Sequence, residues 1–277
     1  LGYEWGVSHP GWRGPFLNID WGKEVPFNVE EDSDFKPNQG FTYYKELSEP
    51  FPEVAGEIGR PDKKFLELDD NTYINGNFQR MSYIEEHRDK ICGWLDYDDK
   101  YKVTDYSSEN YCVIQLRGGD YTTGHSMLPP EYYHNAMKHM RDNNPDIEFI
   151  IVTDDPNTAR RYIPNVPIVG SAISEEKDPY QKNISWYKYT GGPVSIDYSI
   201  LNTAKYAIIS SSTFSFWPIW TNNELKNVIA PMYWFDWSRS NGWWRPQDSI
   251  PNDERWLWMD RDNNLYESKT CIKYRKQ

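Results

Sequence analysis

The 277-residue chain contains few cysteines, fewer basic than acidic residues (30 against 42) and no long apolar run. Its three cysteines, Cys92, Cys112 and Cys271, show no Cys-x-x-Cys spacing and leave at least one thiol unpaired, which favours a reducing compartment over a disulfide framework. The net charge of −12, without a basic stripe, argues against nonspecific nucleic-acid binding. No segment has the length of a membrane span, and no signal peptide is visible. We therefore expect a cytoplasmic protein, at most peripheral to a membrane, or a protein of the Golgi lumen if an anchor upstream of Leu1 has been removed.

Several signatures of common enzyme classes are also missing. The chain has no Gly-x4-Gly-Lys-Ser/Thr string, which argues against a phosphate-loop NTPase, and no Gly-x-Ser-x-Gly elbow, which argues against a serine hydrolase. Asp96 and Asp98 stand close together in a polar stretch, where a solvated turn is a better explanation than a manganese site. The sequence therefore predicts no metal site.

Aromatic residues, by contrast, are abundant, at 16% of the chain with 13 Trp and 21 Tyr. Flat aromatic faces with polar edges suit sugar rings, whereas packing in a loop-rich protein is the simpler explanation for any single Trp. The last third of the chain is crowded with tryptophan: Trp217, Trp220, Trp234, Trp237, Trp243, Trp244, Trp256 and Trp258. This crowding leaves open a protein that binds glycans without acting on them.

Two apolar segments end abruptly in small or polar residues. They are Tyr111–Tyr121 (YCVIQLRGGDY) and Ala207–Trp217 (AIISSSTFSFW). This pattern is typical of buried parallel strands that reach the ligand-bearing edge of a sheet. The first segment brings Arg117 to that edge, and the second brings hydroxyls and backbone amides at the expected start of a helix. Together they predict a receptor for a diphosphate.

Strands alternate with helices in the second part of the chain. We expect strands at 111–116, 148–153, 166–169, 206–210 and 227–230. The expected helices lie at 131–143, 156–162, 195–203 and 214–220. This alternation predicts an α/β fold with a parallel, doubly wound sheet, whose ligands lie outside the carboxyl ends of the strands. Fewer elements are expected before it, namely strands at 41–44 and 73–79 and a helix at 82–95.

The motifs, taken in order, resemble the alpha-1,2-fucosyltransferases of glycosyltransferase family 11. The resemblance covers roughly residues 70 to 260 and is carried by Ile74–Tyr83 (INGNFQRMSY), Gln115–Tyr121 (QLRGGDY), Pro129–Tyr133 (PPEYY), Phe149–Asp155 (FIIVTDD) and Asp197–Trp217. It implies a GT-B-like fold of two Rossmann-like lobes, an acceptor-side lobe at 1–108 and a nucleotide-sugar-binding lobe at 109–277.

The resemblance also implies an activity, which is the inverting transfer of fucose from GDP-fucose to a glycan hydroxyl in an alpha-1,2 linkage. Such enzymes need no metal or other cofactor, because arginine and helix dipoles stabilise the departing diphosphate. Their partners are a nucleotide-sugar donor and a glycan acceptor. Transfer from another GDP-sugar and non-catalytic glycan binding are the alternatives.

Arg117 is the strongest candidate for the diphosphate. A strand-end arginine with glycines after it can grip a diphosphate with two parallel hydrogen bonds, and the family's arginine plays that part for GDP. Its alternative role is a structural ion pair. Ser211, Ser212, Thr213 and Phe214 match the family's Asn-Ser-Thr-Phe-Ser-Trp-Trp segment, where hydroxyls and amides at a helix start suit phosphate. An ordinary helix cap would explain them equally well.

The carboxylates offer further candidates. In related fucosyltransferases an aspartate at the place of Asp197 reads the guanine edge, although a helix cap is the alternative here. Asp154 and Asp155 would hold the base or ribose, or cap the following helix. Asp120 is the nearest candidate for the base that accepts the acceptor's proton, with turn stabilisation as its alternative, and His125 is a second candidate.

The chain departs from the family pattern at three places. Gln115 stands where the family has His, and Arg117-Gly-Gly-Asp120 replaces Arg-Arg-Gly-Asp. Glutamine can still bond a base edge, so we keep Gln115 among the nucleotide-binding candidates. The family's first strand and Gly-Leu-Gly-Asn-Gln turn have no counterpart before Leu1–Trp5, so we expect a truncated or differently built first lobe.

Overall fold

The structure is a computed structural model that describes residues 6–7, 17, 23–24, 42–45, 63–69, 72–75, 81–123, 127–175, 193–233, 237 and 250–274. Every structural statement below concerns these residues. The first elements are β1 (Gly6–Val7), β2 (Lys23–Glu24), β3 (Thr42–Lys45), α1 (Lys63–Leu66), β4 (Thr72–Asn75), α2 (Met81–Ile84), η2 (Glu85–His87), α3 (Arg88–Trp94) and η3 (Asp99–Tyr101).

The remaining elements build the larger part of the described structure. They are β5 (Tyr111–Leu116), η4 (Gly119–Thr123), α4 (Pro130–Asn143), β6 (Glu148–Thr153), α5 (Pro156–Tyr162), η5 (Gly170–Ile173), α6 (Val194–Thr203), β7 (Tyr206–Ile209), α7 (Thr213–Thr221), β8 (Asn227–Pro231), β9 (Trp256–Met259), β10 (Leu265–Glu267) and α8 (Ser268–Tyr274). Six of these strands form one sheet in the order β10-β9-β8-β7-β5-β6. All neighbours are parallel except β10, which is antiparallel to β9.

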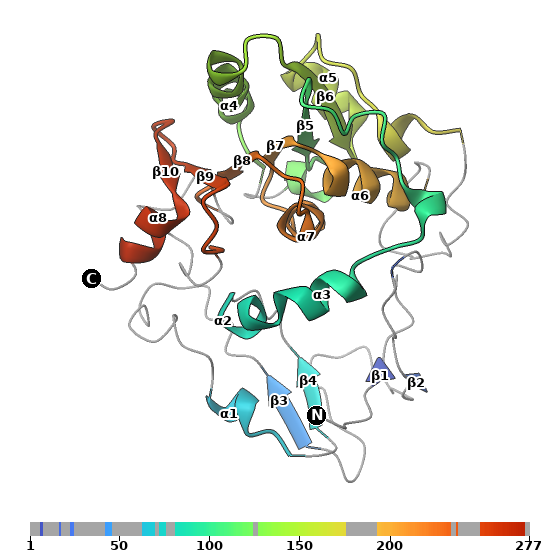
Figure 1. The fold of residues 1–277 in the computed structure, drawn as a ribbon, viewed down its shortest axis with the longest axis vertical. Coiled ribbons are helices and arrows are strands. Elements are labelled where there is room, and N and C mark those ends of the chain that lie inside the picture. Colours follow the sequence, from blue (N-terminus) through green and yellow to red (C-terminus); the bar gives the residue numbers. More distant parts are fainter. Residues whose placement is uncertain are drawn as a thin grey trace.

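Helices cover both faces of this sheet, with α4 and α5 on one side and α6 and α7 on the other (Figure 1). The ring of His134 on α4 bonds the carbonyl of Tyr162 on α5 (2.9 Å), and α6 packs against α7. The arrangement is an α/β fold with a mostly parallel sheet, as the sequence predicted.

The strand order creates a switch point in the sheet. From β5 the chain first moves outward to β6 and then returns to the other side of β5 as β7. The helices that follow β5 and β7 therefore leave on opposite faces, an arrangement that in doubly wound sheets separates the loops at the carboxyl ends of the two strands into a crevice. Ligands of doubly wound sheets bind at such a point. Arg117 follows β5 here, and Ser210–Thr213 follow β7.

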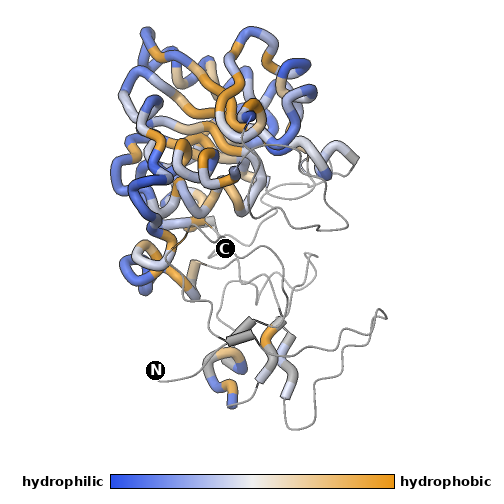
Figure 2. The backbone as a smooth tube through the Cα atoms, turned by 90° about the vertical axis from the view of Figure 1, so that its right-hand side faces the viewer, coloured by the Kyte–Doolittle hydropathy of each residue, from blue (hydrophilic) through white to orange (hydrophobic). Residues whose placement is uncertain are grey.

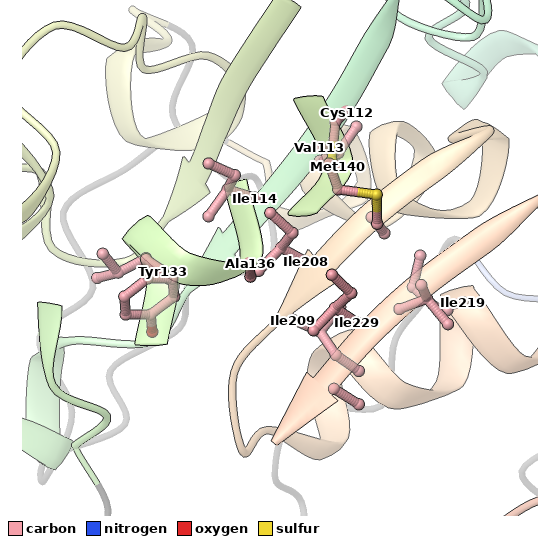
Figure 3. Packing of buried hydrophobic residues seen from close by; sticks show 14 of the residues in the cluster. Cys112, Val113, Ile114, Tyr133, Ala136, Met140, Ile208, Ile209, Ile219 and Ile229 are labelled. Atoms are coloured by element: carbon pink, nitrogen blue, oxygen red, sulfur yellow. The ribbon is translucent and has the colours of Figure 1, made fainter. Parts of the chain in front are cut away.

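The core explains why these segments are strands. Residues Cys112–Leu116 of β5 are all buried, so the strand is covered on both faces, and Gln115 is its one buried polar residue. Ala136 and Met140 of α4 and Ile219 of α7 pack among the buried residues of the sheet (Figure 3). Figure 2 shows the hydrophobic stretches gathered inside this part of the molecule.

Two expectations at the margins of the sheet need correction. The segment 166–169 forms only a single parallel bridge between Ile168 and Ile151, because Pro167 has no amide hydrogen for a ladder. The expected last strand, β8, is followed by two more, because the tryptophan-rich tail supplies β9 and β10. In β9, Trp256 and Trp258 are buried on one face while Leu257 is only partly buried, an alternation that indicates a strand.

The first part of the chain has less regular structure within the described residues. The described portion of 1–108 holds two parallel strand pairs, β1–β2 and β3–β4, rather than a second large sheet. Figure 1 places β3, β4 and α1 at the opposite end of the molecule from the six-stranded sheet. The expected helix at 82–95 is present as α2, η2 and α3 in succession. A second Rossmann-like lobe therefore stays a prediction.

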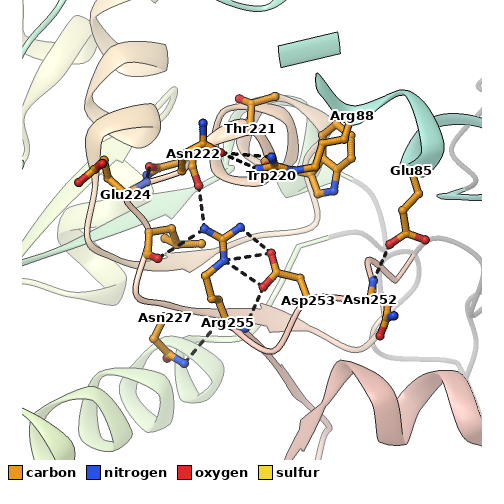
Figure 4. Close-up of polar contacts among 12 residues, drawn as sticks. Glu85, Arg88, Trp220, Thr221, Asn222, Glu224, Asn227, Asn252, Asp253 and Arg255 are labelled. Carbon is orange, nitrogen blue, oxygen red and sulfur yellow. Dashed lines mark hydrogen bonds and ion pairs between the residues drawn. The ribbon is translucent and has the colours of Figure 1, made fainter. Parts of the chain in front are cut away.

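Two arginines from distant segments hold the carboxyl end of α7. Arg88 of α3 donates to the carbonyl of Trp220 (2.9 Å), and Arg255, which precedes β9, donates to the carbonyl of Asn222 (3.0 Å). Asp253 pairs with the Arg255 guanidinium (2.6 Å) and fixes its orientation (Figure 4). Positive charge at this end complements the helix dipole, and the opposite end of α7 points to the switch point.

No helix among the described residues combines the length and apolar character needed to cross a bilayer.

Candidate nucleotide-binding site

Arg117 lies at the carboxyl end of β5 and is held from several directions. Its guanidinium pairs with Asp154 through Nη1 (2.7 Å) and with Asp120 through Nη2 (2.7 Å). Its backbone amide donates to the hydroxyl of Ser210 (3.1 Å), which binds β5 to the end of β7. The Arg117 side chain is 23% exposed, so it is accessible from the crevice while remaining oriented.

Asp154 serves as the inner anchor of this arginine. Its side chain is 9% exposed, and besides Arg117 it accepts a hydrogen bond from the amide of Gly118 (2.8 Å). The carboxylate follows β6 and therefore reaches across to the turn after β5. A buried carboxylate needs such partners, so Asp154 fixes both the guanidinium and the backbone of the turn.

Tyr121 connects the arginine to the second half of the site. Its ring lies under the Arg117 guanidinium, with 5.4 Å from Cζ to the ring centroid. Its hydroxyl donates to the carbonyl of Ser211 in the turn before α7 (2.9 Å). One tyrosine thus spans the distance between the arginine and the amino end of α7, and it holds the two at a defined separation.

The start of α7 offers backbone donors on the other side of the crevice. Ser212 occupies the N-cap position, but its side chain makes no capping hydrogen bond. Within the described structure no oxygen accepts from the amides of Thr213 and Phe214. Amides at a helix start, together with the helix dipole, favour an anion there. Thr213 is exposed and Phe214 half-buried, so an anion could approach.

Gln115 lies beneath these groups rather than at the surface. It is buried on β5, and its Oε1 accepts a hydrogen bond from the Ser210 hydroxyl, which itself accepts from the Arg117 amide. The hydroxyl of Ser211 contacts the carbonyl of Tyr233 beyond β8 (3.4 Å). These bonds fix the floor of the crevice between β5 and β7.

Asp155 has a structural partner of its own. Its carboxylate accepts from the amide (3.0 Å) and the hydroxyl (2.7 Å) of Thr158, so it is the N-cap of α5. These bonds lower the pKa of Asp155, although partial burial acts to raise it. The sequence left open whether Asp155 binds the base or ribose or caps the following helix. In the structure it caps the helix.

Asp197 is buried in the first turn of α6 and faces η5. Both of its oxygens accept hydrogen bonds from Ser171, one from the amide (2.6 Å) and one from the hydroxyl. Burial raises the pKa of Asp197 to about 7, nearby Asp154 acts in the same direction, and the two bonds from Ser171 oppose the rise. The carboxyl therefore lies on the β6 side of the switch point, within electrostatic range of the inner anchor of Arg117.

This raised pKa predicts how stability depends on pH. The folded protein keeps a proton on Asp197 where the unfolded chain has lost it, so the free energy of unfolding should fall as pH rises from 3.8 to about 7 and then level off. Asp197→Asn removes that contribution. Urea unfolding of both proteins inside and above this window measures it, and an equal pH dependence for the two would contradict the prediction.

Gly170 makes room for the Asp197 carboxylate. It adopts φ +84, and a Cβ at this position would lie far inside the contact distance of Asp197 Oδ1. We therefore expect Gly170→Ala to destabilise the protein by about 1–3 kcal/mol, measured by urea unfolding. Gly93→Ala is the matched control, because no atom lies within 4 Å of its Cβ position and alanine favours the helix. Equal effects of the two substitutions would exclude the close approach.

The described tryptophans of the last third mostly pack in the core. Trp220, Trp237, Trp256 and Trp258 are buried, and Trp217 is half-buried. The packing explanation is therefore confirmed for these four. Trp234, Trp243 and Trp244 lie outside the described residues, as does His125. Among the described residues there is also no cluster of three or more metal-ligating side chains, and Asp96 and Asp98 are both exposed.

Sequence reasoning missed four residues that shape the site: Ser171, Ser210, Tyr121 and Tyr133. From the sequence, Ser210 was only the expected end of a strand. Because successive side chains of a strand point to opposite faces, Ser210 and Ser211 could have been expected to face opposite sides of the sheet. The hydroxyl of Tyr133 on α4 is buried near Ser210 but makes no hydrogen bond of normal geometry among the described residues, and burial raises its pKa well above the usual range while Ser210 opposes the rise. Ser171 lies far from Asp197 in sequence, so no local pattern could have connected them.

Comparison with known proteins adds a functional context. The chain is 28% identical to "O-antigen biosynthesis glycosyltransferase WbnK" of Escherichia coli over 200 residues, which covers 63% of this chain and 62% of that protein. It is 22% identical over 198 residues to "Alpha-1,2-colitosyltransferase" of Escherichia coli, which covers 67% of this chain and 62% of that protein. No family model matches the chain.

Both relatives are named as enzymes that transfer a sugar. The chain is therefore similar to glycosyltransferases, one of which is named for an alpha-1,2 transfer. The aligned part spans less than two thirds of the length of either relative.

Proposed function

We propose that the protein is a glycosyltransferase that binds a nucleotide diphosphate sugar at the β5/β7 switch point. The observation that carries the proposal is the position of Arg117 and of the start of α7 at the ends of the neighbouring strands β5 and β7, where a guanidinium lies on one side and backbone amides without an acceptor among the described residues lie on the other. A protein that only binds glycans has no use for such a diphosphate clamp. The similarity to two sugar-transferring enzymes supports the same function.

The donor we propose is GDP-fucose, with a glycan hydroxyl as acceptor and an alpha-1,2 linkage in the product. The resemblance of QLRGGDY and the Asp197–Trp217 segment to the alpha-1,2-fucosyltransferases supports this choice, and the alpha-1,2 linkage in the name of one relative agrees with it. Colitose transfer, which that relative's name indicates, is the main competing reaction. In this proposal residues 1–108 contribute the acceptor side and residues 109–277 the donor side.

The site residues suggest how the reaction would proceed. Arg117 and the amides of Thr213 and Phe214 would bind the two phosphates and take up the negative charge that develops as the donor's C1–O bond breaks. The acceptor oxygen attacks C1 from the opposite face, its proton passes to a carboxylate such as Asp120, and the bonding electron pair leaves with GDP. Charge stabilisation by these groups would remove the need for a metal.

Turnover of GDP-fucose tests the proposal. The protein is incubated with GDP-fucose and a panel of galactose-terminated acceptors, GDP release is followed, and the product is analysed by NMR. We expect GDP release that depends on an acceptor and a product whose anomeric configuration is opposite to that of the donor. A donor of colitose in the same assay separates the two sugars. No turnover of either donor, in a preparation that is folded and contains the full natural chain, would contradict the proposed function.

A further inference from the structure

Arg117 forms ion pairs with two carboxylates that differ in burial. The Asp154 side chain is almost buried and also holds the Gly118 amide, whereas the Asp120 side chain is 58% exposed. Both ion pairs measure 2.7 Å, and they use different nitrogens of the guanidinium, Nη1 for Asp154 and Nη2 for Asp120. One edge of the guanidinium is therefore held by the nearly buried Asp154, and the other edge pairs with the exposed Asp120.

The outer edge is where a phosphate would bind. A guanidinium offers N–H donors whose spacing suits carboxylate and phosphate oxygens alike, so the carboxylate of Asp120 occupies a position that fits a phosphate oxygen. Because the Asp120 side chain is 58% exposed, solvent screens this ion pair and it contributes little, so a doubly charged ligand can displace it. The inner pair with buried Asp154 is harder to break, because separation would leave a desolvated charge without its partner.

The backbone permits this exchange. Asp120 belongs to η4, a single short 3-10 helix, and follows Gly118 and Gly119. Gly119 adopts φ +39, a left-handed conformation that folds the chain back so that Asp120 faces Arg117. A change at this glycine or in the χ angles of Asp120 can turn the carboxylate away without moving β5 or α7.

We propose that Asp120 occupies the phosphate position on Arg117 until the donor binds, and that binding of the donor diphosphate releases its carboxylate toward the acceptor. This inference rests on the proposed function and adds an order of events to it. Before the donor binds, Asp120 is paired and its lone pairs are engaged by the guanidinium. Once a phosphate takes that position, the carboxylate lies close to the leaving group and can accept the proton of the attacking hydroxyl. The base thus becomes available only when a donor is present.

Replacing in turn each of the two carboxylates that pair with Arg117 gives a matched pair of variants. Asp120→Asn removes the competing anion, so GDP should bind about three- to fivefold more tightly, the equivalent of an exposed ion pair of up to about 1 kcal/mol. Asp154→Asn removes the inner anchor, so GDP should bind more weakly than to the unsubstituted protein. Calorimetry with GDP on the full-length protein measures both, and urea unfolding confirms that each variant is folded.

Turnover distinguishes a released base from a simple structural contact. Asp120→Asn should lower kcat for GDP-fucose by at least about 100-fold, the usual range for loss of a general base. Weaker GDP binding by Asp120→Asn, or an unchanged kcat, would overturn the inference. If the unsubstituted protein binds no GDP, the proposed function itself fails, so the two failures give different results.

Discussion

Replacement of Arg117 by alanine is expected to reduce the transfer rate by about 100- to 1,000-fold, the effect of removing one donor that stabilises charge in a transition state. The substitution also leaves the buried carboxylate of Asp154 without its cation and the Tyr121 ring without the guanidinium above it. Initial rates of GDP release from GDP-fucose, with kcat and KM determined separately, measure the effect.

Arg117→Lys is the control for charge alone. Lysine keeps one positive charge but lacks the planar fork that holds Asp154 and a phosphate at the same time. We therefore expect an intermediate loss, with kcat between those of the alanine variant and the unsubstituted protein. Full activity of Arg117→Ala would show that the arginine has only the structural ion-pair role.

Trp220→Ala should cause the largest loss of stability among single substitutions in α7, about 3–5 kcal/mol, because it leaves a large cavity in the core. Trp220 is 2% exposed, packs in parallel with Phe216, and lies under the guanidinium of Arg88. Urea unfolding measures the loss as a decrease in the midpoint concentration. Because the backbone amides at the start of α7 are proposed to bind phosphate, the variant should also bind GDP more weakly even where it remains folded.

The same substitution at an exposed position provides the control. Trp94 at the end of α3 is 46% exposed and contacts Lys90 through a cation–π pair of 5.0 Å. Its replacement by alanine should cost no more than about 1 kcal/mol. Similar losses for Trp94→Ala and Trp220→Ala would mean that Trp220 is not a core residue.

The central sheet could be predicted from the sequence because its signals are local. The apolar runs within 111–116 and 148–153 show no alternation with polar residues, so a buried parallel strand was the natural interpretation. Pro129 and Pro130 indicated the start of helix α4. The position of Arg117 and of Ser211–Thr213 at one sheet edge followed from the alternation of strands and helices, and the structure brings them to the same crevice.

The partners of the site residues could not be predicted, because they depend on contacts between distant segments. Asp154 and Asp155 are neighbours in sequence, yet one faces Arg117 and the other caps α5. Asp197 has its partner in η5, which a sequence pattern does not connect to α6. β9 was missed because the expected strands ended at 227–230 and the tryptophan-rich segment after them was not assigned to the sheet, whereas Trp256 and Trp258 are buried in a strand that pairs with β8.

The most direct test of the account is calorimetric titration of the protein with GDP, UDP and ADP at one ionic strength. The central claim is that Arg117 and the start of α7 form a diphosphate receptor that belongs to a guanine nucleotide site. The account predicts selective binding of GDP and a loss of about 1.5–3 kcal/mol of binding free energy in Arg117→Ala, the contribution of a charge-assisted hydrogen bond. Equal binding of all three nucleotides would contradict the choice of GDP. The absence of nucleotide binding in the folded full-length protein would contradict the receptor itself.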